Sequence, residues 1–101
     1  MKERIVTFEK GPKDKKYTAY IQDKKTKDVR KLHFGAKGYQ QYRDSTPLGL
    51  YANNDHNDIK RMRRYFSRHS GTSRRLEAIE KEKKSSRFRY TPKLLSHIYL
   101  W

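Results

Sequence analysis

The sequence predicts an α+β fold, in which a small antiparallel β-meander is covered by a helix. Three short stretches rich in β-branched and aromatic residues, at about 4–9, 16–22 and 29–34, alternate with polar turns and are typical of strands. A longer segment, at about 57–69, repeats its apolar residues at helical spacing. At 101 residues the chain is long enough for one core only.

The three expected strands are separated by strong turn signals. A glycine–proline pair ends the first strand, and a charged run at 23–28 forms the hairpin turn between the second and the third. In the second strand Tyr17, Ala19 and Ile21 recur at a spacing of two and therefore point to one face. Because two or three strands alone are unstable in water, one face must be covered, and we expect the helix at 57–69 to cover it.

A glycine-rich turn follows the third strand. Gly35 and Gly38 bracket it, and glycine permits the positive φ angles that tight turns need. The segment is too short for a phosphate-binding loop, and no Gly-Lys-Ser/Thr follows it, so we interpret it as a structural turn. Tyr39 and Tyr42, three residues apart, fit one helical turn beyond it.

The helix expected at 57–69 has an apolar edge and a cationic edge. Asn54, Asp55 or Asn57 is expected to cap it, with Asp58 in its first turn. Its apolar edge is expected to face the sheet, and its cationic edge a partner. The residues expected in the core are Phe34, Tyr39, Tyr42, Ile59, Met62 and Phe66.

Residues 72–101 differ in composition from the part before them. A charged second helix is expected at about 73–84, followed by a basic linker and an apolar C-terminal segment. We therefore expect a small α+β domain at 1–71 and a second part, 72–101, that becomes ordered on assembly with a partner.

Charge is the strongest signal in the composition. The chain has 26 Lys and Arg against 11 Asp and Glu, a net charge of +15, which bears on partners rather than on the fold. Nucleic acid, an acidic protein surface and an anionic membrane would each be attracted. Arginines interleaved with aromatic residues at 61–68 suit phosphate neutralisation and stacking, so composition alone favours nucleic acid. The arginines expected to contact the partner are Arg61, Arg64, Arg68, Arg74, Arg75, Arg87 and Arg89.

Residue types and spacings speak against an enzyme or a metalloprotein. There is no cysteine, and the four histidines form neither HxxxH nor HExxH. The carboxylates are scattered among the bases rather than paired for acid–base chemistry. No run of about 18 apolar residues is present to span a bilayer. We expect no catalytic residue, metal, cofactor or small-molecule substrate.

Two spaced motifs resemble a family of small proteins of the nucleocytoplasmic large DNA viruses. Residues 34–42, FGAKGYQQY, and 56–69, HNDIKRMRRYFSRH, match the patterns FGAxGYxxY and HxDxxRxxRYxxRH in that order. Residues 17–23, YTAYIQD, and 95–101, LSHIYLW, are similar to flanking segments of the family. The motif positions are Phe34, Gly35, Gly38, Tyr39, Tyr42, His56, Asp58, Tyr65 and His69.

What the resemblance implies is a minor capsid protein of a large double-stranded DNA virus. Such a protein would be made in the host cytoplasm and would lie on the inner face of the capsid. Its partners would be the major and minor capsid proteins of the same virion, with viral DNA and peripheral contact with an anionic inner membrane as further candidates. The alternative, a basic nucleic-acid-binding or genome-packaging protein, stays open beside it.

Overall fold

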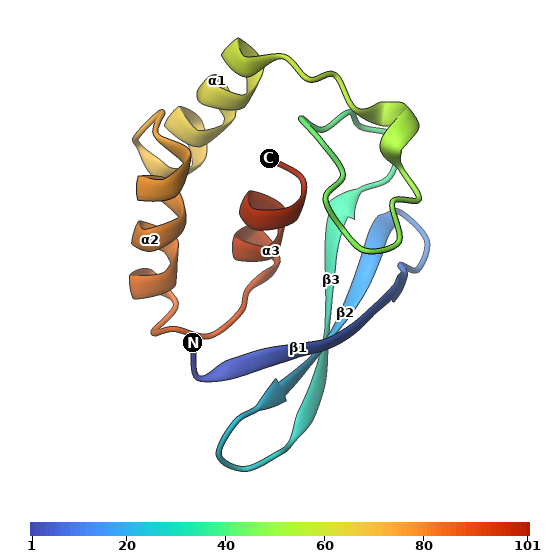
Figure 1. Cartoon of the computed structure of the whole chain (residues 1–101), viewed down its shortest axis with the longest axis vertical. Helices are drawn as coiled ribbons and strands as arrows, with labels where there is room; N and C mark the ends of the chain where they lie inside the picture. Colours follow the sequence, from blue (N-terminus) through green and yellow to red (C-terminus); the bar gives the residue numbers. More distant parts are fainter.

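The computed structural model describes residues 1–101 as a three-stranded sheet followed by three α-helices (Figure 1). The elements in order are β1 (Glu3–Lys10), β2 (Lys15–Asp23), β3 (Val29–Ala36), the 3₁₀ turn η1 (Ala52–Asn54), α1 (Ile59–Ser70), α2 (Arg75–Ser85) and α3 (Pro92–Tyr99). In Figure 1 the strands lie on one side and α1 and α2 on the other, with α3 between them. The predicted α+β class is confirmed.

The sheet is an antiparallel meander with β2 at its centre. β2 pairs with β3 in a continuous register that places Tyr17 opposite Phe34. β1 pairs with the other edge of β2, but its register shifts between Ile5 and Thr7, as in a β-bulge. The strands extend the predicted stretches by one or two residues at their ends.

The C-terminal helix α3, rather than the helix at 57–69, covers the sheet. Leu95 of α3 and the nearby Leu100 are 0% and 1% exposed, and they share the main core with Tyr17, Ile21 and Phe34. α3 contacts β3, whereas α1 packs with α2. The expected sheet-covering role of the helix at 57–69 is therefore wrong. Half of the residues of α1 are Lys, Arg or His, so burying the more apolar α3 removes more hydrocarbon from water.

α1 and α2 form a second, smaller packing layer. Tyr65 and Phe66 of α1 pack with Ala78 of α2. Trp101 contacts this layer and the main core, so the C-terminus joins the two. The expected boundary between 71 and 72 therefore coincides with no break in packing; ordering of the second part on assembly stays a prediction.

Two residues expected in the core, Tyr39 and Ile59, lie at the surface instead, 72% and 51% exposed. Tyr39 follows the turn beyond the end of β3, outside the sheet. Ile59 is the first residue of α1, whose N-terminal end lies away from α2 in Figure 1. The other four expected core residues are buried or partly buried: Phe34, Tyr42, Met62 and Phe66.

The helix ends follow from local residue chemistry. Asp58 caps α1 by accepting hydrogen bonds from the backbone N–H groups two and three residues further on (2.9 and 3.3 Å). The cap expected at 54–57 is wrong, because Asn57 has a φ of 54° and precedes the cap. Gly71, with a φ of 72°, ends α1. The Thr91 hydroxyl caps α3.

Candidate anion-binding cleft

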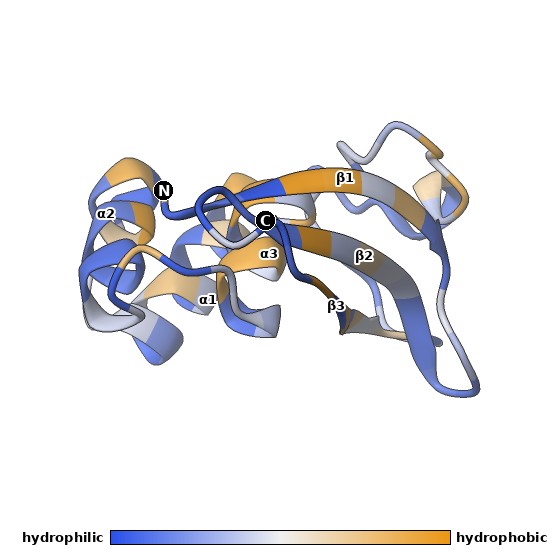
Figure 2. Cartoon of the chain, turned by 90° about the horizontal axis from the view of Figure 1, so that it is seen from below, coloured by the Kyte–Doolittle hydropathy of each residue, from blue (hydrophilic) through white to orange (hydrophobic).

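A cleft of about 650 Å³ lies between the end of β3, α1 and the C-terminal segment. Figure 2 shows α3 between α1 and β3. The strand contributes residues 33–36 to the lining, and the C-terminal segment contributes Pro92, Lys93, Ser96, Leu100 and Trp101. Segments from both ends of the chain thus build one site.

The lining of this cleft is cationic and contains no carboxylate. Its charged and titratable side chains are Lys15, Lys16, His33, Arg61, Arg68, His69 and Lys93. Burial, Lys93 and Arg68 together lower the pKa of His69, so the site resists a further positive charge. Lys93 forms an ion pair with Glu82, which lies outside the lining (3.5 Å). The other cations gathered in this concave surface attract anions. The site suits carboxylate or phosphate oxygens.

Residues of both sequence motifs converge on this cleft. Phe34, Gly35 and Tyr39 of the first motif, Tyr65 and His69 of the second, and the terminal Leu100 and Trp101 all line it. Gly35 has a φ of 79°, and a Cβ there would lie 2.9 Å from Cδ1 of Leu100. Glycine at this position therefore lets the C-terminal segment approach the strand closely.

The remaining motif residues lie outside the lining and contact or position residues that line the cleft. His56 accepts a hydrogen bond from the backbone N–H of Asp58 at Nδ1 (2.9 Å). The His56 ring lies 5.3 Å from the Trp101 ring, and the Trp101 ring stacks on Tyr65 at 4.3 Å. Tyr42 packs edge-on against His56 (6.1 Å). Gly38, with a φ of 90°, shapes the turn that carries Tyr39. Residues of the two motifs therefore form or support the wall of the cleft.

His97 is a buried link between α3 and α1. Its Nδ1 and Nε2 each lie 2.9 Å from a hydroxyl, that of Tyr65 and that of Ser70. Burial, with Lys93, His69 and Arg75 nearby, lowers the pKa of His97 to about 4. The imidazole is therefore neutral near pH 7 and structural in role.

Lys16 is a buried cation of the cleft wall, 1% exposed. Its Nζ donates to the carbonyl oxygen of Tyr39 (2.7 Å) and to Oε1 of Gln41. Burial lowers the pKa of Lys16, an effect opposed by Asp44 and Asp55. This lysine holds the loop after β3 against the sheet.

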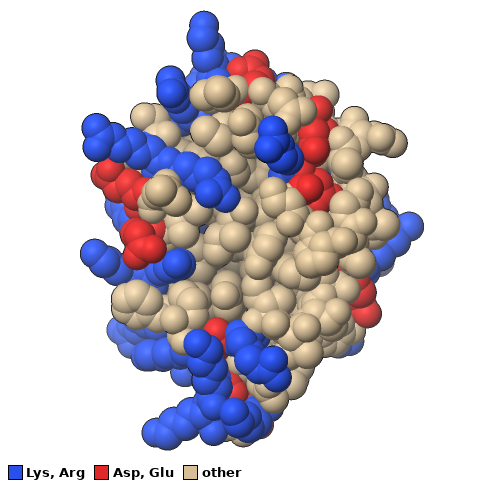
Figure 3. Space-filling view, viewed as in Figure 1, with Lys and Arg blue, Asp and Glu red and all other residues tan.

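Of the seven arginines predicted to contact a partner, Arg61 and Arg68 line the cleft. Arg61 also donates to Oε1 of Gln40 (2.8 Å), and this bond directs it across the cleft toward the turn after β3. Arg64, Arg74 and Arg87 are exposed outside the lining. Figure 3 shows Lys and Arg side chains around much of the margin of one face, with Asp and Glu beside them in several places, so positive charge is not confined to the cleft.

Arg75 has a structural role in place of the predicted contact role. Its Nη2 donates to the backbone carbonyls of His97 (3.3 Å) and Ile98 (2.8 Å), near the C-terminal end of α3. A guanidinium there satisfies carbonyls that the helix leaves without partners.

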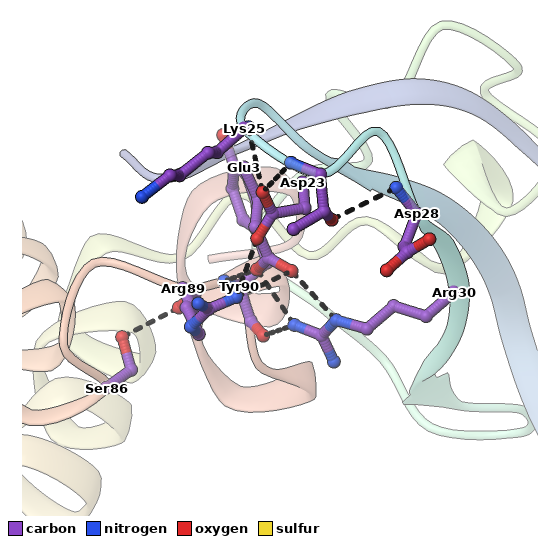
Figure 4. Close-up of polar contacts among 9 residues, drawn as sticks. Glu3, Asp23, Lys25, Asp28, Arg30, Ser86, Arg89 and Tyr90 are labelled. Carbon is purple, nitrogen blue, oxygen red and sulfur yellow. Dashed lines mark hydrogen bonds and ion pairs between the residues drawn. The ribbon is translucent and has the colours of Figure 1, made fainter.

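Arg89, the last of the seven, belongs to an ion-pair network around Glu3 (Figure 4). Glu3 is 2% exposed and accepts two hydrogen bonds from Arg30 (2.8 and 2.9 Å) and one from the backbone N–H of Tyr90 (2.8 Å). Hydrogen bonding to Arg30 is the largest cause that lowers the pKa of Glu3, and the hydrogen bond from Tyr90 adds to it, despite the burial of the carboxylate. Arg89 also pairs with Asp23 (3.2 Å). The network ties β1 and β3 to the segment before α3.

Among the lining residues that sequence reasoning missed are four with a basic side chain, Lys15, Lys16, His33 and Lys93, and the aromatic Trp101. Only Trp101 had a signal, the similarity of the terminal LSHIYLW segment to the viral family. The others come from segments far apart in the chain, and no local pattern connects them.

No group of three or more His, Asp or Glu side chains is placed to hold a metal ion. None of the helices has the length and apolar character needed to cross a bilayer. No protein-family model, curated protein or solved structure matches the chain. Fold and site therefore define the class, a small basic α+β protein with a cationic cleft.

Proposed function

We propose that the chain is a structural protein of the virion of a large double-stranded DNA virus, a minor capsid protein that binds and stabilises neighbouring capsid proteins. The observation that carries this proposal is the convergence of the motif residues on one cleft. Phe34, Tyr39, Tyr65 and His69, which are separated in sequence, share its wall with Trp101. These residues belong to the motifs that resemble the viral family. Because they build one surface, we infer that the motifs serve to bind a partner.

The chemistry of the cleft supports binding without catalysis. Arg61 and Arg68 present guanidinium groups, which pair with carboxylates through two parallel hydrogen bonds. The net charge of +15 would draw the chain to acidic surfaces on its neighbours. No cofactor or small-molecule substrate is part of the proposal.

The proposal includes a place in the particle. The protein is made in the host cytoplasm and lies on the inner face of the capsid, against major and minor capsid proteins. An anionic inner membrane is a peripheral contact at most, since surface lysines and arginines are attracted to it without insertion.

Fractionation of purified particles tests the proposal. Detergent removes the membrane, nuclease and high salt remove the genome, and the chain is then quantified in each fraction by mass spectrometry. We expect it to remain with the capsid shell. Release together with the DNA core would overturn the proposal.

A second candidate function, nucleic-acid binding or genome packaging, is favoured by the five Lys and Arg side chains in a cleft without carboxylates. It predicts micromolar binding to duplex DNA that weakens steeply as salt rises. Replacing Arg61, Arg64 and Arg68 with Ala should reduce that binding about tenfold or more. Unchanged binding would exclude this mechanism.

A further inference from the structure

The outer edge of β3 has unpaired backbone groups. β3 is an edge strand in the order β1-β2-β3, and its eight residues run in continuous register with β2. Within the chain, the backbone N–H and C=O groups of residues 29–35 make hydrogen bonds only to β2. A regular strand edge of this kind is a template for one more strand.

The opposite edge of the sheet is less suited to pairing. The β-bulge between Ile5 and Thr7 interrupts β1, and a bulge twists a strand edge away from a flat partner. The N-terminal end of β1 is also occupied, because the N–H of Lys2 donates to the carbonyl of Phe88 (2.9 Å). β3 is thus the more open of the two edges.

The C-terminal half of β3 lies against the cationic cleft. Residues 33–36 line the cleft, with Arg61 and Arg68 from α1 and Lys93 from α3 in the same lining. The end of this edge strand and the cations Arg61 and Arg68 therefore line the same cleft. An added strand would pair with the unpaired backbone groups of β3, and acidic side chains on it would pair with the arginines.

We infer that β3 and the cleft together bind one extended acidic segment of a neighbouring protein, added to the sheet as a fourth strand with its carboxylates toward Arg61 and Arg68. The inference rests on the proposed function only for the identity of the neighbour as a capsid protein. Backbone pairing supplies affinity in this binding mode, and side chains along the added strand supply specificity.

Charge argues against a second copy of the chain as the added strand. Each copy carries a net charge of +15, and β3 itself bears Arg30, Lys31 and His33. Like charges placed opposite one another on neighbouring strands are destabilising. An acidic segment has the complementary charge.

Single-stranded nucleic acid fits the cleft less well than an acidic strand does. Binding of single strands relies on aromatic rings free to stack with bases. Trp101 is already stacked on Tyr65 at 4.3 Å, with His56 at 5.3 Å, which leaves Tyr39, 72% exposed, as the open ring beside the cleft. Addition of a strand to β3, in contrast, needs no free aromatic ring.

Fluorescence anisotropy with synthetic peptides tests the inference. The probe is a fluorescein-labelled peptide of alternating Glu and Val with the eight-residue length of β3. Its counterpart carries N-methyl groups on alternate backbone nitrogens, which keeps the charge and removes the strand hydrogen bonds. We expect the methylated peptide to bind about tenfold more weakly.

Two double variants of the full chain locate the contact. Arg61→Ala/Arg68→Ala removes two cations of the cleft and should weaken binding of the unmethylated peptide about tenfold. The matched control, Arg63→Ala/Arg64→Ala, removes the same charge from the same helix outside the lining and should change binding less than threefold. In NMR titrations the amides of residues 29–36 should shift more than those of β1.

Three results would each overturn the inference. They are equal binding of both peptides, equal loss in both double variants, and tighter binding of an eight-nucleotide oligothymidine than of the peptide in the same assay. Particle fractionation is independent of these results. If the chain stays with the shell but binds no peptide, strand addition is refuted and the capsid role stands. If the chain leaves with the DNA but still binds the peptide, the capsid role is refuted and strand addition stands.

Discussion

The two packing layers of the molecule differ in what they contribute. The core cluster between the sheet and the C-terminal segment has six buried residues, while the cluster between α1 and α2 has three, and Leu76 of α2 is 73% exposed. The basic helix α1 carries the cations of the cleft, yet the fold is held mainly by residues 92–101 against the sheet. Stability and binding thus lie in different segments, and substitutions should separate them.

The largest expected effect is in the sheet layer. Leu95 is 0% exposed in the main core, so Leu95→Ala should reduce the free energy of unfolding by about 2–5 kcal/mol. The matched substitution Leu76→Ala, at an exposed position in the other layer, should change it by less than about 0.5 kcal/mol. Urea denaturation followed by circular dichroism measures both. Equal losses would contradict the proposed difference between the layers.

Acid should weaken the link between the two layers at His97. In the unfolded chain this imidazole binds its proton near pH 6.5, and in the folded chain only near pH 4. Between these values the unfolded state binds more protons, so stability is complete above pH 6.5 and falls as the pH drops toward 4. The loss attributable to His97 should reach about 2–3 kcal/mol, measured by urea denaturation across this range.

His97→Gln isolates this contribution, because glutamine retains hydrogen-bonding groups and does not titrate. The variant should be less stable than the parent near pH 7 and should lose less on acidification. A smaller dependence on pH remains, because the pKa values of His56 and His69 are also lowered, chiefly by burial. An identical pH profile in parent and variant would show that His97 is not the main titrating link.

The two motif glycines should differ, because only one lies against the C-terminal segment. A Cβ at Gly35 would meet Leu100 at 2.9 Å and Lys16 at 3.0 Å, whereas a Cβ at Gly38 would meet nothing within 4 Å. Both have positive φ, so Gly38→Ala should cost about 1 kcal/mol from backbone strain alone. Gly35→Ala adds overpacking in the main core and should cost about 2–3 kcal/mol. Thermal unfolding compares the pair; similar melting temperatures would contradict the close approach of Leu100 to β3.

Sequence predicted the elements better than their packing. The strands were predictable because Tyr17, Ala19 and Ile21 repeat at period two, and α1 because its two edges are well separated. The covering role of α3 was not predictable, since an eight-residue helix gives a weak periodic signal and apolar content alone does not say which neighbour it meets.

The cleft was predictable in part for the same reason. Arg61 and Arg68 follow from helical spacing, whereas Lys93 joins them only through the tertiary fold. The internal roles of Arg75 and Arg89 depend on Ile98 and Glu3, partners far away in the chain. Charge counting cannot distinguish an arginine that is satisfied inside the fold from one that is free.

The smallest expected effect is local to α1 and tests whether its layer opens independently. Asp58 caps the helix, and hydrogen bonds from the backbone of Arg61 and Lys60 lower its pKa. Asp58→Ala should therefore raise hydrogen exchange of the first-turn amides of α1 about fivefold and leave the amides of β2 unchanged. Asp14→Ala removes the same charge from an exposed loop and serves as the control. If β2 exchanged faster together with α1, the two layers would unfold as one unit, and the division of stability from binding would not extend to their opening.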